Sequence, residues 1–391
     1  MGAENPRPPS LIRGGPWEAF EKAIGVVGPE GTPAVGRIIL LVLLLWLPLV
    51  ILAYAQSGMS AALLVLQDYV VDVRLLLAAP LLLIAESMVD RRVGAALLTM
   101  RREGLIHSDS LPFWDEGLRR AHRFATGALP FLALVVISVV FIIVHLRSPL
   151  QATSVAWMNT TQGTPSWAAI WYTILGRPFC AFLVLLWAWR WLTIVWLFRR
   201  ISKLQLQLMI AHPDRVGGLG VLGEGPYSAT MVIFAMSAVV SSHLAWEMTT
   251  QGATLKSLAP AIGVFAAAAL MFAVGPLFFF TKQLFRLQRK ALVEYGVLAA
   301  RHSHRFEKRW TEEETSREEQ GKDEDIVGAP DFSSLIDLGS SYDVARSIRA
   351  IPFRVSILRS ILLAALLPMV PLLLLEAPLE ELLFKIAKML L

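Results

Sequence analysis

The chain has 391 residues, of which 55% are hydrophobic and 17% charged, and its formal net charge is +5. A soluble protein of this length normally carries more charge, so a large part of this chain must face lipid. The basic residues are concentrated in certain loops, which is typical of membrane orientation and not of nucleic-acid binding. The single cysteine, Cys180, excludes an intrachain disulfide.

Apolar runs along the chain predict membrane-spanning helices, because about 20 apolar residues are enough to cross the hydrocarbon core. Seven runs predict an all-α, polytopic membrane protein. In chain order they are Ile38–Ala55, Leu75–Val89, Ala125–His145, Ile170–Phe198, Ser228–Trp246, Leu258–Thr281 and Val355–Leu375. The second run is short and extends toward Asp90-Arg91-Arg92.

The distribution of Lys and Arg predicts the orientation of these spans. Basic residues collect in segments 90–123, 199–227 and 282–354, whereas segments 56–74, 146–169 and 247–257 are nearly free of them. Because positively charged loops stay in the cytoplasm, we expect the N-terminus inside and the C-terminus outside.

The spans divide the chain into four parts. They are a cytoplasmic N-terminal segment (1–37), a six-helix transmembrane bundle (38–281) with cytoplasmic amphipathic helices at 97–123, a cytoplasmic helical region (282–354), and a seventh span with an amphipathic C-terminal tail (355–391). Within the third part, residues 311–325 are dense in charge and lack apolar periodicity, which predicts an exposed, mobile linker.

Two ionisable residues fall inside predicted spans, where an unpaired charge is costly. Glu86 in the second span and Arg190 in the fourth each lie about a dozen residues from the outer end of their helix. At 1.5 Å per residue both are roughly 18 Å deep, so we expect them to pair. Such a pair is either a structural clamp between helices or a polar point on an ion or solute path.

The loop His212-Pro213-Asp214-Arg215-Val216-Gly217-Gly218-Leu219-Gly220 follows the arginine-bearing helix and concentrates polar chemistry. One interpretation is structural, since Gly217, Gly218 and Gly220 permit left-handed turns. A second is an anion or lipid-headgroup site formed by glycine N–H groups and Arg215. A third is a cation site at Asp214 with His212 or Glu224. The glycine spacing matches neither a Walker loop nor a dinucleotide fingerprint.

Four stretches together resemble a family of uncharacterised bacterial polytopic inner-membrane proteins. They are Val73–Glu86, Arg190-Trp191 with its following helix, the loop His212–Gly220, and Asp331–Phe353. The His-Pro-Asp-Arg-x-Gly-Gly-Leu-Gly loop is the most specific of them. The resemblance implies one fold over most of the chain and a multi-pass protein of the bacterial inner membrane; it implies no activity.

No catalytic motif is visible, and we expect no enzyme, metal site or cofactor. Two hypotheses for function remain. The first is an oligomeric channel or transport-like pore for ions or small solutes, with Glu86, Arg190 and the glycine loop along its path. The second is a non-conducting membrane scaffold or sensor that engages a cytoplasmic or membrane partner. Expected partners are the lipid bilayer, including anionic lipids, a second copy of the chain, and a protein at the cytoplasmic face, but no nucleic acid.

Overall fold

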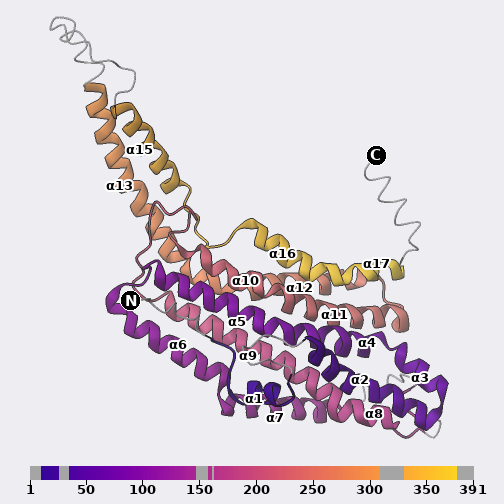
Figure 1. The fold of residues 1–391 in the computed structure, drawn as a ribbon. Helices are drawn as coiled ribbons and strands as arrows, with labels where there is room; N and C mark the ends of the chain where they lie inside the picture. The colour runs from indigo at the N-terminus through magenta and orange to yellow at the C-terminus, as the bar shows by residue number, and fades with distance from the viewer. Residues whose placement is uncertain (1–9, 26–34, 147–156, 161–162, 309–329, 377–391) are drawn as a thin grey trace, which may run out of the picture.

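The computed structural model describes residues 10–25, 35–146, 157–160, 163–308 and 330–376. Within these ranges the chain is helical and has no strand, which confirms the predicted all-α fold (Figure 1). The predicted linker at 311–325 and the predicted tail beyond residue 376 lie outside the described residues.

Six helical stretches within the described residues are long and apolar enough to cross a membrane. They are Ile38–Ser57, Ser108–Phe141, Trp167–Ile201, Leu219–Gln251, Leu255–Glu307 and Val355–Glu376. These stretches coincide with six of the seven predicted spans and confirm a polytopic membrane protein. The side of the membrane on which the N-terminus lies stays a prediction.

The remaining predicted span, Leu75–Val89, has a different character. It lies in a continuous helical run made of α4 (Tyr69–Asp72), η1 (Val73–Ala78) and α5 (Ala79–Arg102). This run contains several charged side chains, Glu86 among them, and is less apolar than the six stretches above. Much of α5 is nevertheless buried. Neighbouring helices therefore surround α5, and its role as a seventh span stays a prediction.

The buried centre of the bundle consists of α5, α9 (Arg177–Ile201) and α11 (Thr230–Gln251), which run side by side (Figure 1). Two further helices, α2 (Val35–Ser57) and α7 (Ala128–Leu146), lie at the periphery and expose large apolar side chains. A polar-poor, exposed helix surface is what a lipid-facing helix requires. The buried charged residues Glu86, Asp90 and Arg190 therefore lie in the central helices, whereas the helices at the edge present an apolar surface.

The amphipathic region predicted at 97–123 is divided between two helices. Its first residues complete α5, which ends at Arg102, and the rest belong to α6 (Leu111–Thr126) after the short turn η2 (Ser108–Ser110). Between them, His107 N donates to the carbonyl of Gln205 at 3.2 Å. This contact attaches the turn to the segment that follows α9.

A helical arm extends from one end of the bundle. It begins where α12 (Leu255–Val274) passes through η6 (Gly275–Phe280) into α13 (Thr281–Glu307), and α15 (Pro330–Arg346) packs along α13. Figure 1 shows this pair projecting away from the other helices. The chain then returns along α11 and α12 as α16 (Val355–Leu366), η8 (Leu367–Met369) and α17 (Val370–Glu376).

Two π-helical segments interrupt the helices at the end of the bundle opposite the arm. η1 precedes α5, and η4 (Tyr172–Gly176) connects α8 (Trp167–Trp171) to α9. Gly176 is required here, because a Cβ at this position would lie 2.5 Å from the Tyr172 ring. π-Helical turns are rare and are found mostly at functional sites.

Candidate functional site

Glu86 and Arg190, which the sequence places at similar depth, are in contact. Arg190 Nη2 donates to Glu86 Oε1 at 2.7 Å, and both side chains are almost completely buried. The second oxygen, Glu86 Oε2, accepts from the indole N–H of Trp17 at 3.2 Å. Each oxygen of this carboxylate therefore has a donor supplied by the chain itself, as a buried charge requires.

The pair lies near the junction between α6 and α7. Trp189, the neighbour of Arg190, donates from Nε1 to the carbonyl of Phe124 in the last turn of α6 at 2.7 Å. The adjacent Thr126 carbonyl is packed so closely against Gly15 that a Cβ there would lie 1.9 Å away. Gly15 and Thr126 thus dock the N-terminal helix beside the ion pair.

The N-terminal segment 10–25 was predicted only as cytoplasmic, but it packs into the bundle. Asp90 Oδ1 accepts from the backbone N–H groups of Leu11 at 2.8 Å and Ile12 at 3.0 Å. The short helix α1 (Gly15–Ala23) then places Trp17 against Phe182 of α9, with ring centroids 5.0 Å apart. An acidic residue of α5 and an aromatic anchor therefore hold this segment in place.

A second buried carboxylate, Glu21, faces the ion pair from α1. It is 2% exposed, and its Oε2 has no hydrogen-bond partner among the described residues. Burial raises the pKa of Glu21 to about 8, and the Glu86 carboxylate adds to this rise. The guanidinium of Arg190 acts in the opposite direction but does not cancel it. Near neutral pH Glu21 is therefore mainly protonated in the folded protein.

The glycine loop is closed around the side chain of Asp214. Its carboxylate accepts from the backbone N–H groups of Val216 at 2.9 Å, Gly218 at 3.0 Å and Gly220 at 2.9 Å. His212 Nδ1 lies 2.8 Å from the same carboxylate. An anion-binding arrangement of backbone amides is thus present, and its anion is an aspartate of the loop itself.

The backbone of the loop requires the residues that the sequence supplies. Gly217 and Gly218 have φ angles of 68° and 96°, and a Cβ on Gly220 would lie 2.9 Å from the Asp214 carboxylate. Arg215 also has a positive φ, 58°, while its side chain is exposed. Because the amides already bind Asp214, these observations favour the structural interpretation over an external anion or a cation.

Arg349, which sequence reasoning did not single out, joins the loop to the root of the arm. Its Nη2 donates to the carbonyl of Asp214 at 3.0 Å, and its own backbone N–H donates to the carbonyl of Arg215 at 2.8 Å. Its Nη1 donates to the carbonyl of Phe353 at 2.6 Å. One side chain therefore links the loop, the end of α15 and the approach to α16.

The described residues contain no cluster of three or more His, Cys, Asp or Glu side chains placed to bind a metal ion. No family model, curated protein or solved structure matches the chain. The fold defines a polytopic α-helical membrane protein, and its buried centre contains the ion pair between Glu86 and Arg190.

Proposed function

We propose that this protein is a non-conducting membrane scaffold or sensor whose helical arm engages a partner. The observation that carries the proposal is the Arg349 contact, because it connects the loop after α9 to the root of the arm. A displacement of the central helices would reach α13 and α15 through this contact. The proposed location is the bacterial inner membrane, with the arm in the cytoplasm.

The charges that would mark a conducting path support the same proposal. Glu86 is bound by Arg190 and Trp17, and Asp90 by backbone N–H groups. In a buried ion pair of this kind each charge is compensated by the other member, so neither needs a passing ion. The clamp interpretation of the pair is therefore part of this proposal.

The arm offers a chemically defined surface to a partner. Six exposed basic residues lie along α13, namely Lys282, Arg286, Arg289, Lys290, Arg301 and Arg305. A cytoplasmic protein with an acidic surface complements this helix, since opposite potentials favour association. The anionic membrane surface is the competing attraction for a basic helix.

A flux assay separates this proposal from its alternative, an oligomeric pore. The full chain is reconstituted into liposomes loaded with an ion-sensitive dye, beside empty liposomes. We expect no flux above the empty liposomes, for wild type and for Glu86→Gln alike. Flux that requires the protein and is altered by Glu86→Gln overturns the proposal and makes the pair part of a pore.

Coupling to the arm is measured separately by hydrogen exchange in detergent. Asp214→Asn weakens the loop to which Arg349 is hydrogen-bonded. We therefore expect faster amide hydrogen exchange in α15 and unchanged exchange in α2. Exchange in α15 that is identical to wild type overturns the sensor proposal, because the loop then does not communicate with the arm.

A further inference from the structure

A cavity of about 460 Å³ lies among the central helices at the end opposite the arm. It is bounded by η1 and α5 on one side, by α9 and its π-helical approach on another, and by α7 and α11. Both π-helical segments contribute to its lining, through Arg74 and Ala78 of η1 and Tyr172 of η4. Its volume is within the range of roughly 300–1,000 Å³ that is typical of small-molecule sites.

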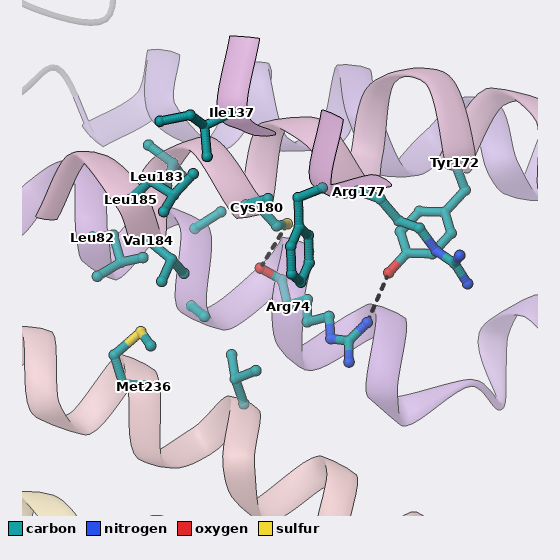
Figure 2. A pocket seen from close by; sticks show the side chains of 15 residues that line it. Arg74, Leu82, Ile137, Tyr172, Arg177, Cys180, Leu183, Val184, Leu185 and Met236 are labelled. Atoms are coloured by element: carbon teal, nitrogen blue, oxygen red, sulfur yellow. Dashed lines mark hydrogen bonds between the residues drawn. The ribbon is translucent and has the colours of Figure 1, made fainter. Parts of the chain in front are cut away.

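The lining is polar at one end and apolar at the other (Figure 2). Arg74 and Arg177 lie with Tyr172 at the polar end, where Arg74 Nη1 donates to the Tyr172 hydroxyl at 3.4 Å and the Arg177 guanidinium lies 5.4 Å from the Tyr172 ring centroid. The apolar end is formed by side chains such as Leu82 and Val184. The cavity is therefore amphipathic along its length.

Two guanidinium groups line the polar end of the cavity, and no acidic side chain is among the described residues that line it. The hydrogen bond of Arg74 is made to the Tyr172 phenol, while the Asp68 carboxylate acts on Arg74 from outside the lining. The lining itself therefore carries positive charge at this end. An anionic group is the ligand that complements it, and arginine is well suited to bind phosphate.

The apolar end is open toward lipid. Ile137 and Phe141 of α7 line the cavity, and they are 50% and 53% exposed on a helix whose surface is apolar. A molecule can therefore enter from the bilayer between α7 and its neighbours without passing through water. A water-soluble solute would find few polar groups here, whereas an acyl chain finds a matching surface.

We propose that this cavity binds an acidic membrane phospholipid, with its phosphate at Arg74 and Arg177 and one acyl chain among Leu82, Val184 and Ile137. The site lies in a different part of the bundle from the loop and the arm. It therefore stands whether the protein conducts ions or not.

Lipid binding is tested on the full chain purified in a neutral detergent. Phosphatidylglycerol and phosphatidylcholine with identical acyl chains are added separately, and retained lipid is quantified by mass spectrometry together with the unfolding midpoint. We expect phosphatidylglycerol to be retained and to raise the midpoint more than phosphatidylcholine does. Equal retention of the two lipids by wild type overturns the proposal, and this comparison needs no variant.

Variants then locate the site. Arg74→Gln is expected to lower phosphatidylglycerol affinity by about tenfold or more, the size of one charge-assisted hydrogen bond. Val184→Phe, which fills the apolar end, is expected to lower the affinity for both lipids. Lys256→Gln is the matched control, since it removes an exposed positive charge at the same end of the bundle outside the cavity. A loss with Lys256→Gln equal to that with Arg74→Gln overturns the assignment to the cavity.

The head group alone is tested with glycerol phosphate and with inorganic phosphate. We expect neither to raise the unfolding midpoint at concentrations where phosphatidylglycerol does, because neither occupies the apolar end. A shift as large as that given by the lipid shows a simple phosphate site and overturns the lipid assignment.

Discussion

Arg349 donates from Nη2 to the main-chain carbonyl of Asp214 at 3.0 Å, across 135 positions of the sequence. The same two segments are joined a second time by the Arg349 N–H and the Arg215 carbonyl. Asp214 in turn holds the amides of its own loop through its side chain. The loop and the root of the arm are consequently one hydrogen-bonded unit, and disturbance of either part is expected to be felt in the other.

Arg349→Gln tests this unit. The shorter amide cannot reach the carbonyls of both Asp214 and Phe353, so we expect a loss of roughly 1.5–3 kcal/mol in unfolding free energy, as for a hydrogen bond to a charged group. Hydrogen exchange in residues 212–220 should accelerate. Arg346→Gln is the control, because this exposed arginine lies in the last turn of α15 and should have little effect. Equal destabilisation by both variants would contradict the role given to Arg349.

Asp214→Asn tests whether the carboxylate is the anion of the loop. Burial alone would raise the pKa of Asp214, but hydrogen bonds from the backbone amides and from His212 outweigh it and lower the pKa. The resulting stability is present above the unfolded pKa, about 3.9, and is lost as pH falls through the folded value.

The measurement is the unfolding midpoint between pH 7 and pH 3. Wild type should lose stability through the acidic end of this range, and Asp214→Asn should start lower and lose less. Asp109→Asn is the control, since its side chain is 81% exposed and should leave the wild-type profile intact. An Asp214→Asn protein as stable as wild type at pH 7 would show that the amides do not need this charge.

Much of the fold could be predicted from the sequence, because apolar length and helix rise are local properties. The contact between Glu86 and Arg190 was predictable for the same reason, since counting residues along two spans gives their depths. The glycines of the loop 212–220 predict left-handed turns, but they do not predict that the Asp214 carboxylate binds the backbone amides of the loop. The identity of the anion that the amides bind depends on the orientation of the Asp214 side chain, and the spacing of residues in the sequence does not determine that orientation.

Other contacts depend on long-range packing that no local pattern reveals. The helix α1 has nine residues, too few for a periodic signal, and only its docking buries Trp17 and Glu21. Arg349 lies in an irregular connection far along the chain from the loop that it holds. The π-helical turns that supply Arg74 and Tyr172 also have no sequence signature of the kind that marks a helix end.

The Glu86–Arg190 pair is tested by a double-mutant cycle. Removing one member leaves the other charged and buried, so Glu86→Gln and Arg190→Gln should each cost about 3–5 kcal/mol. The double variant removes both charges and should cost clearly less than the sum of the two. Unfolding in detergent gives these values. An additive double variant would show that the two side chains do not stabilise one another.

Glu21 makes docking of the N-terminal segment dependent on pH. Its pKa in the folded protein is raised to about 8 by burial, whereas in the undocked segment it returns to an ordinary value near 4.3. The docked state therefore holds the proton more tightly. Docking is fully stable below the undocked pKa and weakens as pH rises through the folded value, by up to about 1.4 kcal/mol per pH unit.

Hydrogen exchange in residues 10–25 measures this docking between pH 6 and pH 9, after correction for the intrinsic pH dependence of exchange. Protection should fall over this range in wild type, and Glu21→Gln, which cannot ionise, should stay protected. Glu18→Gln is the comparison on the same helix: the Glu18 carboxylate adds to the rise of the Glu21 pKa, so this variant should still lose protection, at a slightly lower pH than wild type. Equal protection of wild type at pH 6 and pH 9 would contradict the prediction, since a carboxyl buried beside Glu86 cannot ionise without cost.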